Sequence, residues 1–268
     1  MFLIQSNSIQ SVAVTLGLIS LGIVAGGCTG VPRNAVPEHL ASSASVPSMT
    51  GIRYWGDEPP SNMADEVREI IRQRRAAGDA GYQRGASPRI NILVLSGGAD
   101  NGAYGAGLLN GWSDRGTRPQ FDIVTGVSTG ALTAPFAFLG SDYDQALKEV
   151  YTKYEAKDYF EARPLQGLLG GTSLADVAPL YGLISHYAND DLIDAVAREH
   201  QKGRRLFVQT TNLDAQRPVI WDMGAIAGYR SPEARELFRR VLLASASVPA
   251  IFPPVRIRVR ADGRDYEE

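Results

Sequence analysis

The sequence of 268 residues is poor in the side chains that bind metals or cross-link a chain. It has a single cysteine, so no internal disulfide can form. Its three histidines are His39, His186 and His200, and no two of them stand at zinc-ligand spacing with a carboxylate or a thiol. The sequence therefore predicts no metal site.

A strong charge of either sign is also missing. The net charge is -2, and no run of Lys or Arg, with or without interleaved aromatic residues, gives a basic surface for nucleic acid. Hydrophobic residues make up 44% of the chain and charged residues 21%, which is typical of a globular protein with a sizeable core. We therefore expect a folded protein of one large or two small domains that does not bind nucleic acid.

Long apolar stretches are rare in the sequence, and the longest notable one, residues 11–28, ends at the single cysteine. Residues Ser11–Cys28 have about the length of a signal-peptide core and are slightly short for a membrane span. Small residues lead into Cys28, and this pattern resembles the lipobox of bacterial lipoproteins, in which the signal is cleaved before a cysteine that is then lipidated. Two features depart from it, because Ala25 stands where Leu is usual and the first basic residue is Arg33.

An uncleaved anchor helix with an incidental cysteine is the alternative interpretation of residues 1–28. In both cases the protein is exported or tethered to a membrane. Thr29 and Gly30 follow the cysteine in place of Asp, which in lipoproteins resembles an outer-membrane destination in the bacterial cell envelope. Residues 29–89 are rich in Pro, Ser, Ala and charge and indicate a tether, with one helix expected over Ser61–Gly78.

From residue 90 onwards, short apolar runs alternate with helical patterns. Strands are expected within residues 89–97 and 121–127, and the continuous apolar run of the first is typical of a parallel strand that is covered on both faces. Helices follow these strands within 102–116 and 129–140. Further helices are expected over 143–154, 190–201 and 231–244, and residues 204–214 and 217–223 indicate a pair of strands. This order predicts an α/β fold with a mostly parallel sheet for residues 90–268.

The pentapeptide Gly126–Gly130, G-x-S-x-G, lies at the junction of an expected strand and an expected helix. A strand that turns sharply into a helix forces the serine into a strained conformation, and glycine on either side leaves room for it. Ser128 is therefore the candidate nucleophile, in an elbow formed by Gly126, Val127, Thr129 and Gly130. The amides of the helix N-terminus would favour developing negative charge there.

A glycine-rich stretch, residues 95–107, lies about thirty residues upstream, again between strand and helix. It could form an oxyanion hole from the amides of Gly97, Gly98 and Ala99. It could instead be a phosphate-binding loop, although it contains no strict G-x-G-x-x-G and no Gly-Lys-Ser/Thr. A third interpretation is that its small residues only allow a helix to pack closely on the sheet.

Together these two stretches resemble the patatin-like phospholipases. Residues 244–257, ASASVPAIFPPVRI, and residues 210–227 also match the family, so the resemblance runs from about residue 90 to the end. It implies a three-layer fold with a mostly parallel central sheet, Ser128 as nucleophile and the glycine-rich loop as oxyanion hole. The chain departs from the family at Ala99, where a third glycine is usual, and at Asn101, where many members carry Arg or Lys.

The resemblance also implies a Ser-Asp dyad, whose aspartate lies in an Asp-Gly motif shortly after the Phe-Pro-Pro segment. The available match is Asp262-Gly263. The preceding residues alternate apolar and arginine side chains as a half-exposed strand does, so Asp-Gly is expected to form a hairpin turn. Asp262 therefore suits a turn better than a general base, and we expect the dyad aspartate beyond Glu268, in a domain that is C-terminally incomplete.

The expected function is that of a lipid-anchored serine acyl hydrolase of the phospholipase A, lysophospholipase or lipid esterase type, acting on lipid acyl esters without a metal or organic cofactor. A serine without its base loses most of its activation, so this fragment is expected to have little activity. Two alternatives stay open. One is a non-catalytic, membrane-anchored scaffold or binding protein with the same fold. The other is an esterase with a conventional Ser-His-Asp triad, which would use His186 or His200, although both are expected to be solvated residues at helix ends.

Overall fold

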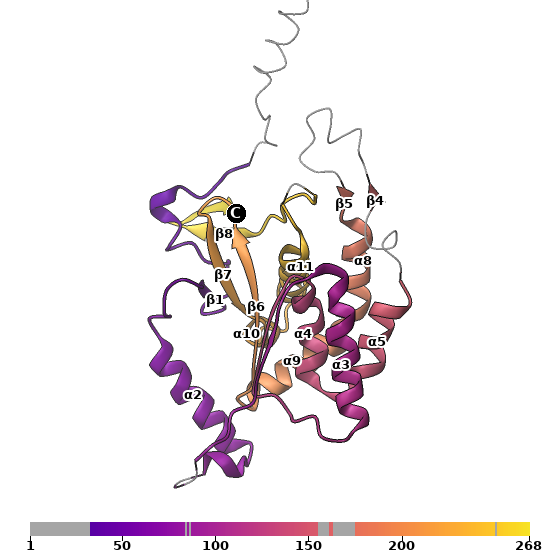
Figure 1. Ribbon diagram of the computed structural model, residues 1–268. Coiled ribbons are helices and arrows are strands. Elements are labelled where there is room, and N and C mark those ends of the chain that lie inside the picture. The colour runs from indigo at the N-terminus through magenta and orange to yellow at the C-terminus, as the bar shows by residue number, and fades with distance from the viewer. Residues whose placement is uncertain (1–32, 84, 86, 155–160, 163–174, 250) are drawn as a thin grey trace, which may run out of the picture.

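A mixed five-stranded sheet forms the centre of the molecule in the computed structural model (Figure 1). The structure describes residues 33–83, 85, 87–154, 161–162, 175–249 and 251–268. The strand order is β1-β7-β6-β3-β2, in which β2, β3 and β6 are parallel neighbours and β7 runs antiparallel to both β6 and β1. The expected α/β fold with a mostly parallel sheet is thus confirmed.

The strands of this sheet are β1 (Arg53–Trp55), β2 (Ile92–Leu95), β3 (Ile123–Val127), β6 (Arg205–Asn212) and β7 (Arg217–Asp222). Two short antiparallel pairs lie outside it, β4 (Glu161–Ala162) with β5 (Ala175–Asp176), and β8 (Arg258–Ala261) with β9 (Arg264–Glu267). The α-helices of the described part are α2 (Met63–Ala76), α3 (Gly102–Asp114), α4 (Thr129–Leu139), α5 (Asp144–Thr152), α8 (Ala178–Tyr187), α9 (Asp190–Gln201), α10 (Met223–Gly228) and α11 (Pro232–Ala246).

The register of the parallel strands brings their carboxyl ends to one edge of the sheet. Leu95 pairs with Gly126, and Gly126 pairs with Val208 on the other side. The segments that leave β2, β3 and β6 therefore start side by side, at the edge where ligands bind in open α/β sheets. This edge holds the pentapeptide and the glycine-rich stretch.

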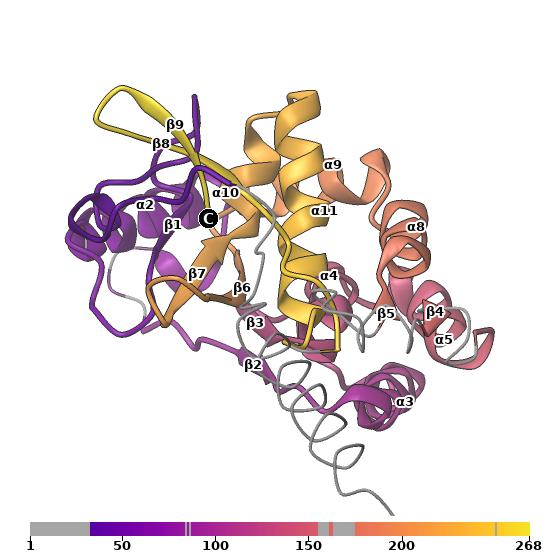
Figure 2. The same cartoon turned by 90° about the horizontal axis from the view of Figure 1, so that it is seen from above.

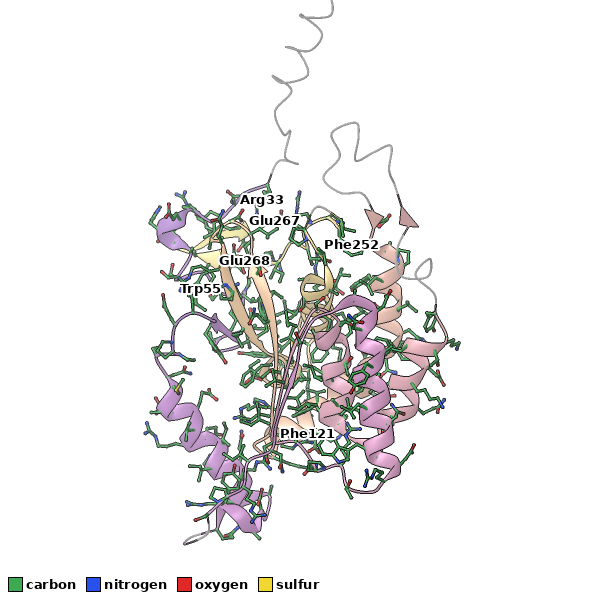
Figure 3. All side chains as sticks on the ribbon, viewed as in Figure 1. Arg33, Trp55, Phe121, Phe252, Glu267 and Glu268 are labelled. Atoms are coloured by element: carbon green, nitrogen blue, oxygen red, sulfur yellow. The ribbon has the colours of Figure 1, made fainter. Side chains whose placement is uncertain are left out.

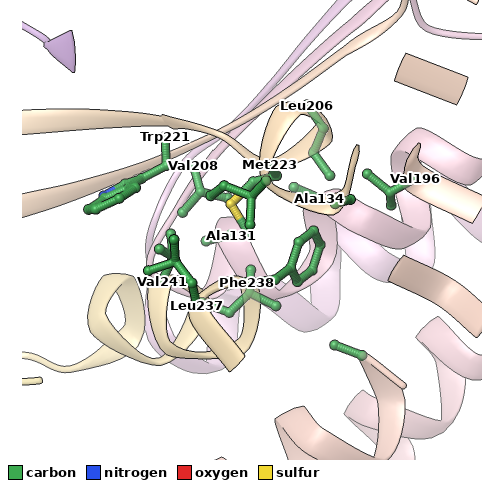
Figure 4. Close-up of a cluster of buried hydrophobic side chains, with 14 of the residues drawn as sticks. Ala131, Ala134, Val196, Leu206, Val208, Trp221, Met223, Leu237, Phe238 and Val241 are labelled. Atoms are coloured by element: carbon green, nitrogen blue, oxygen red, sulfur yellow. The ribbon is translucent and has the colours of Figure 1, made fainter. Parts of the chain in front are cut away.

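The main core lies between the sheet and one layer of helices. Viewed from above, α3, α4, α5, α8, α9 and α11 lie on one side of the sheet, and α2 with the β8–β9 hairpin lies on the other (Figure 2). Figure 4 shows side chains of the sheet packed against α4, α9 and α11: Leu206, Val208, Trp221, Ala131, Ala134, Val196, Leu237, Phe238 and Val241. Each large apolar side chain buried here stabilises the fold by roughly 1.5–3 kcal/mol.

The described part of residues 29–89, which the composition predicted to be a tether, is part of the fold. Its residues 53–55 form β1, which pairs with β7, and Ile52 is 1% exposed. Upstream, Ser45 exchanges two backbone hydrogen bonds with Arg260 of β8. A strand of three residues is too short to show a period, so its sequence resembles a linker. The helix expected over 61–78 is present as α2.

Strand β2 differs from the expectation that it is covered on both faces. Its residues Ile92 and Val94 are 56% and 72% exposed, while the alternate residues Leu93 and Leu95 are half-buried. The strand lies at an edge of the sheet, and the helices of the described part cover one of its faces. A continuous apolar run therefore did not distinguish one covered face from two.

The C-terminal hairpin has the predicted form. Asp262 and Gly263 link β8 to β9 with φ angles of 46° and 72°, as a two-residue turn with two left-handed positions requires. Ile257 and Val259 are buried, whereas Arg258 and Arg260 are exposed. The alternation of apolar and arginine residues in the sequence thus correctly predicted that one side of β8 is buried and the other faces solvent.

Candidate active site

Ser128 lies in the sharp turn between β3 and α4. Its backbone has φ 56° and ψ -126°, a combination that a residue with a side chain adopts only under strain. The residue precedes the first turn of α4, yet its side chain makes no capping hydrogen bond to that helix. The strained turn therefore has the form of the predicted nucleophile elbow. In this turn the hydroxyl of Ser128 is not used to cap α4.

The two glycines of the pentapeptide are required by close backbone contacts. A Cβ atom on Gly126 would lie 2.5 Å from the carbonyl oxygen of Gly130, and one on Gly130 would lie 2.3 Å from the carbonyl oxygen of Leu95. Backbone atoms cannot move aside as a flexible side chain can. Gly126 therefore allows the turn itself, and Gly130 allows α4 to approach the end of β2.

The glycine-rich loop lies directly against the serine. A Cβ atom on Gly97 would be 3.0 Å from the Cβ and 3.6 Å from the Oγ of Ser128. Gly98 has φ 156° and Ala99 has φ 47°, and Asn101 then donates its amide to the carbonyl of Gly98 as the chain enters α3. The structure thus brings together the loop and the elbow that the sequence singled out.

Ser245 is a residue of this site to which sequence reasoning gave no role. The amide of Ser128 donates to Ser245 Oγ at 2.9 Å, and Ser245 Oγ donates to the carbonyl of Gln209 on β6 at 2.7 Å. This hydroxyl therefore links the elbow to the neighbouring strand and occupies the amide of Ser128. Ser245 belongs to the ASASVP stretch that carries part of the family resemblance, which was the available signal.

A cavity of about 620 Å³ opens beside the nucleophile. Its lining combines the elbow, the carboxyl end of β6, the end of α11 and the proline-rich segment that follows: Val127, Ser128, Gln209, Thr210, Thr211, Asn212, Leu213, Ala244, Ser245, Ser247, Val248, Pro249, Pro253, Pro254 and Val255. The volume and the mixed apolar and hydroxyl lining suit part of an organic molecule with an apolar chain.

Two carboxylates line the same cavity, and arginines hold both of them. Asp214 accepts two hydrogen bonds from Arg33, whose pKa it raises, and one of these bonds measures 2.7 Å. Glu268 is paired with the buried Arg53 and accepts a hydrogen bond from Asn212 at 3.1 Å. Both carboxylates are therefore already engaged by arginine side chains rather than by Ser128.

Neither candidate histidine lies in this cavity. His186 is exposed on α8, with its ring edge-on to that of Tyr187. His200 lies at the end of α9, near the amino end of β6, where its backbone carbonyl accepts from Arg205. Ser128 follows the carboxyl end of β3, so the length of the sheet separates it from His200. This placement argues against a conventional triad.

The environment of His200 also corrects the expectation of a solvated residue. Its side chain is 17% exposed, and Nδ1 lies 3.5 Å from a carboxylate oxygen of Asp222 without a hydrogen bond. Burial, with the nearby charge of Arg205, lowers the pKa of His200 to about 4. Burial also raises the pKa of Asp222 to about 6. The pair is a structural feature of the amino-terminal edge.

The remaining predicted residues lie away from the serine or outside the described part. Asp262 is exposed in the hairpin turn and is not among the residues that line the Ser128 cavity. Cys28 lies outside the described residues. Within the described ranges, no group of three His, Cys, Asp or Glu side chains could hold a metal ion. No helix in that part of the chain is long and apolar enough to cross a bilayer.

Fold and site together define an α/β protein with a serine at a strand–helix elbow and a glycine-rich loop beside it. A family model described as patatin-like phospholipase matches residues 93–265, which is more than half of the chain. The chain therefore belongs to the patatin-like phospholipase family, whose members are lipid acyl hydrolases. No curated protein matches the chain at a significant level.

Proposed function

We propose that the protein is a serine hydrolase of lipid acyl esters, of the phospholipase A, lysophospholipase or lipid esterase type, with Ser128 as its nucleophile. The observation that carries the proposal is the strained elbow of Ser128, packed against Gly97 and open to a large cavity. Ser128 Oγ attacks the ester carbonyl, and amides of Gly97, Gly98 and Ala99 stabilise the negative charge of the tetrahedral intermediate. Collapse of this intermediate breaks the bond to the alcohol, which leaves with the proton that Ser128 has lost, and water then hydrolyses the acyl-serine to the free acid and the serine hydroxyl.

The base in this proposal is an aspartate, as in the family's Ser-Asp dyad. The two carboxylates that line the described cavity, Asp214 and Glu268, are both held by arginines and suit that role poorly. Asp262 lies in an exposed turn. The proposal therefore assigns the role of base to none of these three carboxylates.

We further propose that Cys28 carries a lipid anchor in the bacterial cell envelope, at the outer membrane. The support is the apolar run that ends in small residues before this cysteine. A single acyl chain gives only marginal membrane binding, whereas several chains on one residue give a stable anchor. Mass spectrometry of the protein extracted from membranes would show cleavage before Cys28 and an added diacylglyceryl mass.

The nucleophile is tested by covalent labelling with a fluorophosphonate, which needs an activated serine and an oxyanion hole. We expect fluorophosphonate labelling of the protein to vanish in Ser128→Ala, and its hydrolysis of a short acyl ester to fall by roughly 10³-fold or more. Ser247→Ala is the matched control, because Ser247 lines the same cavity but donates its hydroxyl to Leu243 of its own helix. Unchanged labelling or hydrolysis in Ser128→Ala would refute the assignment, and an unlabelled parent would favour the non-catalytic scaffold.

A further inference from the structure

We propose that the mouth of the Ser128 cavity is a membrane-docking surface, and that Leu213, Val248 and Ile251 insert into the apolar part of a lipid bilayer. We call these three residues the rim. The proposal rests on the proposed function in two respects, because it treats the cavity as the entrance for a lipid and uses a membrane attachment at Cys28. It goes beyond it by fixing which face of the molecule meets the membrane.

The rim is apolar and exposed where the described fold has its reactive edge. Leu213 is 47% exposed, Val248 47% and Ile251 44%. Leu213 follows the carboxyl end of β6, and Val248 follows the end of α11. Both line the cavity together with Ser128, so apolar surface surrounds the opening through which a substrate would pass. Side chains of this kind gain free energy when they leave water for the boundary between headgroups and acyl chains.

The short distance along the sequence between Arg33 and Cys28 supports a lipid bilayer as the partner of this surface. Arg33 is the first residue that the structure describes, and it also lines this cavity. It is five positions from Cys28, which ends the apolar run, so the two are at most about 18 Å apart in a fully extended chain. A membrane attachment at Cys28 would therefore keep Arg33, and with it the cavity that Arg33 lines, within about 18 Å of the attachment point.

The side chains at this end of the molecule agree with that orientation. Arg33, Glu267 and Phe252 lie at one end, and Phe121, which precedes β3, lies at the opposite end (Figure 3). Arg33 is fixed there by contacts on both sides, since it binds Asp214 and the carbonyl of Glu267. Arg33 is thus held at the cavity by its own side chain.

The arginines at the mouth are paired with carboxylates of the protein. This surface therefore differs from one that binds a membrane through the charge of anionic lipids. Arg33 pairs with Asp214, and Arg256 pairs with Glu267 at 3.2 Å. Docking is therefore driven by the apolar rim, and zwitterionic phosphatidylcholine should be sufficient. The prolines of the segment that carries Val248 and Ile251, among them Pro249 and Pro253, restrict its backbone and hold these side chains outward.

The test measures the depth of single tryptophans in the membrane. The full chain is reconstituted in phosphatidylcholine vesicles with plain or brominated acyl chains, and the emission added by Leu213→Trp or Val248→Trp is taken relative to the parent protein. Bromine quenches tryptophan on contact, so this added emission should be lost in the brominated vesicles. Ile90→Trp is the matched control, because Ile90 is equally apolar and 52% exposed but precedes β2 at the opposite edge of the sheet.

The expected result is quenching at the rim, persistent emission at residue 90, and the same pattern when anionic lipid is added or the salt concentration is raised. Equal quenching at residues 213 and 90, no quenching at the rim, or no association with the vesicles would overturn the proposal. Dependence on anionic lipid would also overturn it, in favour of an electrostatic contact. The measurement is repeated in Ser128→Ala, where quenching without hydrolysis would show that docking stands even if the proposed catalysis fails.

Discussion

Ala99 is the residue at which this chain departs from its family inside the glycine-rich loop. Its φ of 47° falls in the left-handed region, where a side chain on Cα crowds the following carbonyl. A third glycine would adopt this conformation without strain. The departure therefore affects the stability of the loop more than its chemistry, since alanine keeps the amide that the oxyanion hole needs.

Ala99→Gly should raise the free energy of unfolding by about 0.5–1 kcal/mol, because relief of strain outweighs the greater flexibility of glycine in the unfolded chain. Ala103→Gly is the control, as Ala103 lies exposed in α3 and its replacement should lower stability by about 1 kcal/mol. Urea unfolding of the three proteins compares them directly. A loss of stability in both variants would mean that the backbone at residue 99 is not strained.

At the level of single residues, the sequence predicted the elbow and the loop because both use glycine in fixed positions. Gly97 and Ser128 are thirty-one positions apart, yet they are the second residue after β2 and the first residue after β3, so their meeting follows from the strand order. Ser245 and Arg33 could not be predicted in this way. Their partners lie 117 and 181 residues distant, and serine and arginine carry no local signature for such contacts.

Helix α3 approaches the elbow through a residue that has no side chain. A Cβ atom on Gly102 would lie 2.3 Å from Thr129 Oγ1 and 2.6 Å from Tyr151 Oη. These two hydroxyls are hydrogen-bonded to each other at 2.8 Å and link α4 to α5 behind the nucleophile. In the same helix, a Cβ atom on Gly107 would meet nothing within 4 Å.

Alanine substitutions at these two glycines should therefore have opposite effects. Gly107→Ala should stabilise the protein by about 1 kcal/mol, because alanine is the better helix former at an exposed position. Gly102→Ala should destabilise it by about 1–3 kcal/mol through overpacking and should also reduce fluorophosphonate labelling of Ser128. Thermal unfolding combined with labelling rates checks both. Stabilisation by Gly102→Ala would show that α3 can move away from α4 without effect.

The helices and strands that sequence patterns predicted well are those with a clear period or a clear cap. The expected helix over residues 190–201 coincides with α9, where Asn189 accepts the amide of Leu192 as a cap. The predicted strand pair is present as β6 and β7. Among the elements that were missed are β1, α8 and α10. They are three, ten and six residues long, and burial by distant segments stabilises them more than local pattern does.

Across the whole molecule, polar side chains are buried at the edge of the sheet opposite the site. Arg74 of α2 binds Asp122 at 2.5 Å, and Asp122 also accepts the amide of Asn91 ahead of β2. His200 and Asp222 belong to the same edge. The buried polar residues thus lie at one edge of the sheet and Ser128 at the other. We expect pH to change the stability of the protein chiefly through these buried polar residues.

The pH dependence of stability tests the state of His200. Since its pKa is lowered from 6.5 to about 4, the unfolded chain takes up a proton at a higher pH than the folded protein does. Its contribution to stability is therefore complete above pH 6.5 and is lost as the pH falls towards 4. Relative to His200→Gln, the wild type should lose on the order of 2–3 kcal/mol over this range.

Asp222→Asn is the matched comparison for this measurement, because the pKa of Asp222 is raised to about 6. The folded protein then binds the proton more tightly than the unfolded chain does, so the wild type should gain stability relative to this variant as the pH falls from 6 towards 4. Urea midpoints at several pH values supply both differences. If the difference in stability between the wild type and His200→Gln did not change with pH, the imidazole of His200 would take up its proton as readily in the folded protein as in the unfolded chain.

The backbone of Ser128 has a consequence for choosing between an enzyme and a scaffold. Its φ of 56° with ψ of -126° is a conformation that glycine adopts freely, whereas a residue with a side chain is strained there by about 1–3 kcal/mol. A protein shaped only to fold and to bind would be more stable with a third glycine in the pentapeptide. The serine thus lowers the stability of its own fold, and such a residue is understood most simply as one that is present for its reactivity.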